Sequence, residues 1–162
     1  MSAILEKLSQ EAVSLLKAKG AFCTFAESLT GGLIAATLVN TSGASEVFQG
    51  SLVTYCDKVK HEKLGVETKV LEEKSAVSYE CAMQMAQGAL QSMCANVAIS
   101  ATGYAGPGGG TESDPAGTFY LGYADKNGNS SMRYHFDGSR SEVRDYAVQK
   151  ALELLIERVN LL

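Results

Sequence analysis

The sequence predicts an α/β fold: a three-layer α/β/α sandwich with a mixed, mostly parallel sheet and an antiparallel hairpin edge. Two observations support this prediction. Segments with helical periodicity alternate with short apolar segments early in the chain, which is typical of parallel strands joined by helices. An Asn-Gly pair at 127–128 then separates two strand-like segments, and this pair is a strong hairpin signal.

The sequence of the first half of the chain predicts three helices and two strands. An apolar helical stripe begins at Ile4 and ends before Gly20, and a polar turn cluster occupies 40–44. β-Branched and aromatic residues around Val53 favour a strand. We expect helices at 4–19, 33–39 and 56–64, a further helical turn at 69–74, and strands at 21–26 and 48–55.

The second half predicts a long helix, three strands and a closing helix. The long helix begins at Ser78 and carries a face of small and flexible side chains (alanine, methionine and cysteine), which is typical of close packing in a core. We expect strands at 97–102, 118–124 and 132–136, a hairpin turn at 126–129, and a final helix at 141–159.

Composition bounds the class of protein. The chain has 162 residues, 46% of them hydrophobic and 20% charged, as expected of one globular domain spanning 1–162. Its net charge of −4 argues against nucleic-acid and membrane-surface partners, which favour a basic face. Glu6 and Lys7 lie where a signal peptide would be apolar, so we expect a cytoplasmic protein.

The four cysteines form no CxxC pair, and the two histidines do not fall at zinc-ligand spacing around them. We therefore expect reduced thiols, mostly buried as small apolar side chains. The sequence indicates no metal site and no cofactor.

A short polar turn, 27–32, joins the first strand to the second helix. Ser28 is its strongest candidate nucleophile, and Thr30 is a weaker one. The following helix offers backbone N–H groups to an anion, while Gly31 and Gly32 permit close approach by a substrate. The alternative is that Ser28 and Thr30 only cap the helix.

Gly103 to Gly110 contains five glycines in eight positions, each of which loses conformational entropy when ordered. Such a loop can present backbone N–H groups to a phosphate or carboxylate. Its spacing matches neither a dinucleotide fingerprint nor a P-loop. The alternative is a flexible surface loop.

Tyr55 ends a predicted strand, and Lys60 lies about one turn into the next helix. Both side chains can therefore reach the sheet edge that carries Ser28. A buried lysine with a lowered pKa can serve as the base for a serine. The alternative is that Lys60 belongs, with Lys58 and Lys63, to a solvated helix face.

Arg140 and Arg144 lie four residues apart at the start of the last helix and therefore share one face. Two arginines in this arrangement can clamp a phosphate. The alternative is that they pair with Glu142 or neighbouring carboxylates.

Nearly the whole chain resembles the CinA C-terminal family, with matching motifs in the same order. The resemblance is carried by Glu27-Ser28-Leu29-Thr30-Gly31-Gly32, Val53-Thr54-Tyr55 with Lys60, Leu64-Gly65-Val66, Ala76-Val77-Ser78, Thr102-Gly103-Tyr104-Ala105-Gly106-Pro107-Gly108-Gly109, Pro115-Ala116-Gly117-Thr118 and 138–144. Members of the family are nicotinamide-nucleotide amidases, and the chain is similar to their stand-alone form.

The resemblance implies hydrolysis of nicotinamide mononucleotide to nicotinate mononucleotide and ammonia, without a cofactor. By the family's pattern, Ser28 is the nucleophile, Lys60 its base and Tyr55 an aid to proton transfer. Backbone N–H groups around Thr30 and Gly31 would hold the oxyanion. The substrate-binding positions implied are Thr30, Gly31, Gly32, Gly103, Ala105, Gly106, Gly108, Gly109 and Arg140.

Three positions depart from the family's usual residues: Tyr104, which can reshape the pocket, Ser139, and Cys56, a conceivable rival nucleophile. Two alternative functions stay open. One is a non-catalytic module that binds a nucleotide or phosphate, linked to competence or damage responses, and the other is an amidase for another small carboxamide. A homodimer is the default expectation.

Overall fold

The computed structural model describes residues 1–162 and contains one five-stranded sheet with strand order β2-β1-β3-β4-β5. The strands are β1 (Cys23–Glu27), β2 (Phe48–Val53), β3 (Val97–Gly103), β4 (Thr118–Asp125) and β5 (Gly128–His135). The helices are α1 (Ala3–Lys19), α2 (Leu33–Val39), α3 (Asp57–Leu64), α4 (Thr68–Glu73), α5 (Tyr79–Met93) and α6 (Arg140–Asn160), with a 3₁₀ turn at Ala44–Glu46.

The sheet is mixed, as predicted. β1 pairs in parallel with both β2 and β3, whereas β4 pairs antiparallel with β3 and β5. β4 is therefore the one strand that runs against the other four. The carboxyl ends of β1, β2 and β3 consequently meet at one edge of the sheet, where open α/β folds bind their ligands.

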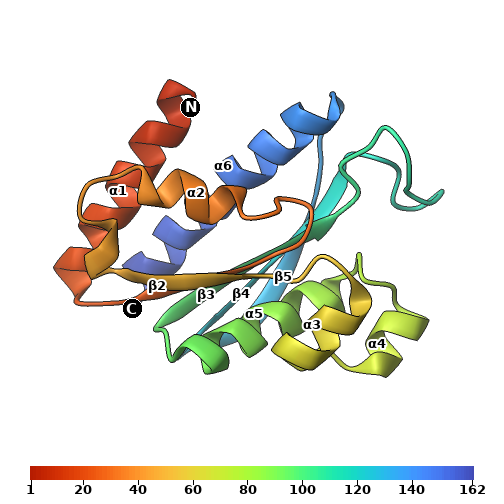
Figure 1. Cartoon of the computed structure of the whole chain (residues 1–162), viewed down its shortest axis with the longest axis horizontal. Helices are drawn as coiled ribbons and strands as arrows, with labels where there is room; N and C mark the ends of the chain where they lie inside the picture. Colours follow the sequence, from red (N-terminus) through yellow and green to blue (C-terminus); the bar gives the residue numbers. More distant parts are fainter.

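Helices cover both faces of the sheet (Figure 1): α1, α2 and α6 lie on one face, and α3, α4 and α5 on the other. The first group encloses the main core of 26 buried residues, and the second a smaller one of eight. The predicted small-residue face of α5 lies against the sheet, since a Cβ added at Gly122 would collide with the backbone of Ala82. The three-layer prediction is confirmed.

Most elements begin and end within one or two residues of the predicted bounds, and two of the differences have a clear physical cause. β5 begins at Gly128, not at 132, because the polar residues after the turn continue the ladder, with Asp125 paired to Gly128. Such residues suit a strand whose outer side is open to solvent. α6 begins at Arg140, one residue early, because Ser139 forms a capping box with Glu142.

The four cysteines are all free, as expected, but only Cys23 and Cys81 are buried, whereas Cys56 and Cys94 are exposed. No helix combines the length and the apolar character needed to cross a membrane.

Candidate active site

Ser28 lies in the tight turn between β1 and α2, at the carboxyl edge of the sheet. Its backbone N–H donates to the carbonyl of Ala101 on β3 at 2.9 Å, which fixes the turn against the neighbouring strand. Gly31 and Gly32 adopt φ values of +58° and +99°. Glycine is needed at both positions because L side chains rarely occupy this region. The sequence thus folds a serine hydroxyl onto the sheet edge.

The N-terminus of α2 is occupied by a side chain of the protein itself. The buried Glu27 carboxylate accepts hydrogen bonds from the N–H groups of Gly32, Ile34 and Ala35, each at 3.0 Å, and from the Ser51 hydroxyl at 3.2 Å. The prediction that this helix end is open to an anion was therefore wrong. The capping alternative for Ser28 is wrong as well, because Glu27 supplies the cap.

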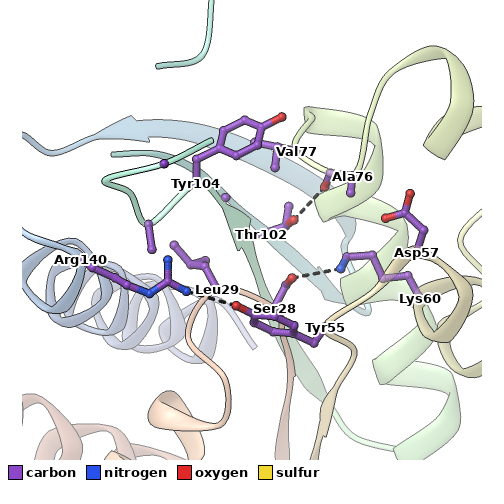
Figure 2. Close-up of a pocket in the computed structure, with 13 residues that line it drawn as sticks. Ser28, Leu29, Tyr55, Asp57, Lys60, Ala76, Val77, Thr102, Tyr104 and Arg140 are labelled. Carbon is purple, nitrogen blue, oxygen red and sulfur yellow. Dashed lines mark hydrogen bonds between the residues drawn. The ribbon is translucent and has the colours of Figure 1, made fainter. Parts of the chain in front are cut away.

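Lys60 lies on α3 with only 1% of its surface exposed. Its Nζ is 3.0 Å from Ser28 Oγ (Figure 2). The same Nζ is 2.7 Å from the carbonyl oxygen of Thr54. The alternative of a solvated lysine face therefore holds for Lys58 and Lys63 but not for Lys60.

Burial lowers the pKa of Lys60, because an ammonium is costly in an environment that excludes water. Negative charge on Cys81, Asp57 or Cys56 would oppose this shift. Burial also raises the pKa of the Cys81 thiol to about 12, so that thiol is neutral at ordinary pH and does not hold the proton on Lys60. The arrangement favours a neutral amine within hydrogen-bond reach of a serine hydroxyl.

Two backbone N–H groups beside Ser28 have no acceptor in the protein, although one of them belongs to Thr30, which is fully buried. The Gly31 N–H donates to the carbonyl of Ser28 within the turn, whereas the N–H groups of Leu29 and Thr30 donate to no protein acceptor. Arg144 donates to the carbonyl oxygens of Leu29 and Thr30, at 2.9 and 3.0 Å. Because the Leu29 carbonyl and the Thr30 N–H belong to one peptide group, Arg144 also fixes the direction of that N–H.

A cavity of 260 Å³ opens over Ser28. Its 13 lining residues are Ser28, Leu29, Tyr55, Asp57, Lys60, Ala76, Val77, Thr102, Gly103, Tyr104, Ala105, Gly108 and Arg140. Among the predicted site residues, the structure therefore brings together Ser28, Tyr55, Lys60, Gly103, Ala105, Gly108 and Arg140. The other predicted positions, Thr30, Gly31, Gly32, Gly106 and Gly109, lie outside this lining.

Arg140 bridges two walls of the cavity. Its Nη2 donates to the hydroxyl of Tyr55 at 3.2 Å (Figure 2). Its Nη1 donates to the carbonyl of Gly106 at 3.0 Å. Neither Arg140 nor Arg144 pairs with Glu142, which belongs to the capping box of α6. The prediction that both arginines clamp one phosphate is therefore wrong. Arg140 lines the cavity, whereas Arg144 binds the backbone of the Ser28 turn.

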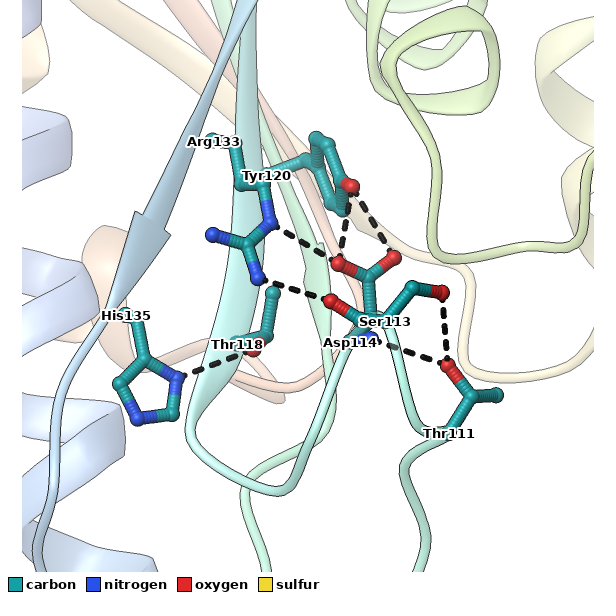
Figure 3. Close-up of polar contacts among 7 residues, drawn as sticks. All are labelled: Thr111, Ser113, Asp114, Thr118, Tyr120, Arg133 and His135. Carbon is teal, nitrogen blue, oxygen red and sulfur yellow. Dashed lines mark hydrogen bonds and ion pairs between the residues drawn. The ribbon is translucent and has the colours of Figure 1, made fainter.

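The glycine-rich loop continues to Gly117 and is held by hydrogen bonds in its later part. At its base, the N–H of Gly117 donates to the carbonyl oxygen of Tyr104 at 2.7 Å. Farther out, the Asp114 carboxylate accepts from the Tyr120 hydroxyl at 3.0 Å and from Arg133 Nε at 2.9 Å (Figure 3). Burial, with the hydrogen bond to Asp114, raises the pKa of Tyr120 to about 12. These contacts argue against the alternative of a flexible surface loop.

Sequence reasoning missed several residues with clear roles in this arrangement. Asp57 could have been identified as a candidate from the sequence, because it precedes Lys60 by three residues and shares its helix face. Glu27 was also recognisable as a carboxylate at the end of a buried strand. Thr102, which donates to the carbonyl of Ala76 at 2.7 Å, and Asp114 gave no such signal.

A sequence model of the CinA C-terminal domain matches residues 5–159. The chain belongs to this family. A CinA-like protein of Dictyoglomus thermophilum is 42% identical over 148 residues, covering 91% of this chain but 36% of that protein. The chain thus spans about a third of the length of such CinA relatives.

Other relatives match this chain over nearly their whole length. A protein of Enterobacter agglomerans named nicotinamide-nucleotide amidohydrolase PncC is 43% identical over 150 residues, covering 92% of both chains. The crystal structure of competence/damage inducible protein CihA from Agrobacterium tumefaciens is similar, with a TM-score of 0.93 and 39% identity. It covers 99% of this chain and 98% of that one. A CinA superfamily structure from Klebsiella pneumoniae also has a TM-score of 0.93, at 33% identity.

Proposed function

We propose that the protein is an amidase that hydrolyses nicotinamide mononucleotide to nicotinate mononucleotide and ammonia through an acyl-enzyme on Ser28. The observation that carries this proposal is the contact of 3.0 Å between Ser28 Oγ and the buried Lys60 Nζ. The similarity to a protein named nicotinamide-nucleotide amidohydrolase supports the choice of substrate. In this proposal residues 1–162 act as one catalytic domain, working as a homodimer in the cytoplasm.

The first half of the reaction forms the acyl-enzyme. Neutral Lys60 takes the proton from Ser28 Oγ while Oγ attacks the carboxamide carbon. The N–H groups of Leu29 and Thr30 stabilise the negative charge that develops on the carboxamide oxygen. The Lys60 ammonium then returns the proton to the amide nitrogen, and the C–N bond breaks to release ammonia.

The second half frees the acid. A water molecule attacks the acyl carbon, Lys60 takes the water's proton, and the proton returns to Ser28 Oγ as the ester bond breaks. The serine and lysine supply both nucleophile and base, so we expect the reaction to need no metal or cofactor.

The rest of the substrate would bind along the cavity. Arg140, at its rim, is placed to bind the 5′-phosphate, together with backbone N–H groups of the glycine-rich loop at 103–110. Tyr55 lies between Arg140 and the reacting centre in Figure 2, where its hydroxyl can assist proton transfer. Gly31 and Gly32 support binding indirectly, through the shape of the Ser28 turn.

The test is release of ammonia from nicotinamide mononucleotide by the purified protein, with a chelator present. We expect turnover that is lost in Ser28→Ala and in Lys60→Met. Cys56→Ser is the matched control, because Cys56 is exposed nearby and lies outside the cavity lining, so its activity should equal that of the wild type.

Two other results would identify the competing functions. Absence of turnover, with a melting temperature raised by the nucleotide, would indicate a non-catalytic binding module. Turnover of another small carboxamide in preference to the nucleotide would indicate a different amidase.

A further inference from the structure

Asp57 is the one acidic side chain among the residues that line the cavity over Ser28. It forms no hydrogen bond or ion pair with the rest of the chain, and its side chain is exposed. A carboxylate that opens into a reactive cavity without a protein partner is available to a ligand.

The position of Asp57 relates it to the reacting atoms. It lies one helical turn before Lys60 on α3, and its negative charge acts on the Lys60 amine. In Figure 2, Arg140 lies on one side of Ser28, whereas Lys60 and, beyond it, Asp57 lie on the other side. A substrate whose phosphate is bound by Arg140 and whose carboxamide reaches Ser28 therefore presents its far end, the amide group, toward Asp57.

An amide and the acid formed from it have nearly the same shape and differ in two properties. The amide nitrogen carries two N–H donors and no charge, whereas the carboxylate carries only acceptors and one negative charge. A carboxylate beside the reacting carbon therefore accepts a hydrogen bond from the amide and repels the acid.

We propose that Asp57 selects the carboxamide over the carboxylate at the reacting carbon, binding the amide N–H of the substrate and weakening the binding of the acid product. This inference rests on the proposed amidase function. Lys60 strengthens the effect in its neutral form, because an uncharged amine does not attract the product's carboxylate.

Asp57 also occupies the first turn of α3, where a negative charge stabilises the helix dipole. That role alone predicts that its substitution lowers the melting temperature and weakens both ligands alike. The ratio of the two affinities is therefore the informative quantity, since a purely structural role leaves it unchanged.

The experiment measures binding of nicotinamide mononucleotide and nicotinate mononucleotide by calorimetry to Ser28→Ala, which cannot turn over the substrate. We expect this variant to prefer the amide by about tenfold or more. In Ser28→Ala/Asp57→Asn, the affinity for the acid should rise by about tenfold and the preference should disappear. Ser28→Ala/Glu62→Gln is the control, because Glu62 lies on the same helix outside the cavity and should leave the preference intact.

The outcomes separate the two proposals. Equal binding of both nucleotides to Ser28→Ala, or a preference that survives Asp57→Asn, overturns the role of Asp57 alone. Failure of both nucleotides to bind Ser28→Ala overturns the proposed substrate and the selection by Asp57 together.

Discussion

The guanidinium Nε of Arg144 donates a hydrogen bond of 2.9 Å to the carbonyl oxygen of Leu29, 115 residues earlier in the chain. Through this bond α6 fixes the peptide group whose N–H, that of Thr30, is one of the two free donors beside Ser28. Arg144 lines no part of the cavity, so under the proposed function we expect any effect on the reaction to pass through the backbone.

Arg144→Lys is therefore expected to lower kcat by roughly 10- to 100-fold with little change in KM, since a lysine cannot bond both carbonyls and a misplaced oxyanion donor acts mainly on the transition state. Steady-state kinetics with nicotinamide mononucleotide measures both constants. Arg140→Lys is the matched comparison, because Arg140 lines the cavity and should mainly raise KM. A raised KM with unchanged kcat in Arg144→Lys would contradict the role in orientation.

The pH dependence of the reaction should report the ionisation of Lys60. Only the neutral amine can accept the proton of Ser28, so kcat/KM should rise with pH until Lys60 is deprotonated. Burial lowers the pKa of Lys60, and the rise should therefore occur below the ordinary lysine value of about 10.5. Lys60→Arg should be inactive at every pH, because its guanidinium stays charged. A kcat/KM that does not rise with pH anywhere below about 10.5 would count against Lys60 as the base.

The buried Lys60 should also lower the free energy of unfolding. Lys60→Met removes a buried amine and is expected to raise the free energy of unfolding by about 1 kcal/mol or more at pH 7. The folded chain holds the lysine proton less tightly than the unfolded chain does, so the stability of the wild type rises with pH through this range. The advantage of Lys60→Met should accordingly shrink at pH 9. Urea unfolding at both pH values tests this, with the exposed Lys63→Met as the control.

Glu27 should be a stability determinant of the nucleophile turn. Glu27→Gln replaces a carboxylate that accepts four hydrogen bonds by an amide with a single oxygen, and we expect a loss of about 2 kcal/mol or more. Urea unfolding measures the loss. Glu11→Gln, an exposed change on α1, should have almost no effect. Equal stabilities for the two variants would show that the cap on α2 contributes little.

Asp114 should control the order of the glycine-rich loop. Asp114→Asn removes the charge that holds Arg133, so the backbone amides of 104–117 should exchange with solvent faster, and KM should rise. Hydrogen exchange followed by mass spectrometry measures the first effect. Glu112→Gln changes an exposed charge in the same loop and should leave exchange unaltered. Unchanged exchange in Asp114→Asn would show that contacts other than those of Asp114 order the loop.

The sequence predicted features that depend on local pattern. The bounds of α2 at Leu33–Val39 and the hairpin at 127–128 follow from apolar periodicity and turn chemistry, which short segments encode by themselves. Ser28 was found for the same reason, because a serine in a strand-to-helix turn is visible in a single stretch.

The remaining features depend on which segments meet. Lys58, Lys60 and Lys63 look alike in sequence, and only the packing of α3 against α5 and the sheet edge buries the middle one. The contacts of Arg144 with Leu29, and of Arg133 with Asp114, join distant positions that no periodicity links.

The division of the cavity between two parts of the chain has a consequence for how the protein can change over evolution. Ser28 and Lys60 lie 32 residues apart in one stretch, whereas the opposite wall comes from the later segment between Thr102 and Arg140. Under the proposed function, mutations that reshape that wall are expected to alter which amide binds without changing the contact between Ser28 and Lys60. If the proposed amidase function holds, exchange of the 103–117 loop between relatives is therefore expected to change which amides are hydrolysed.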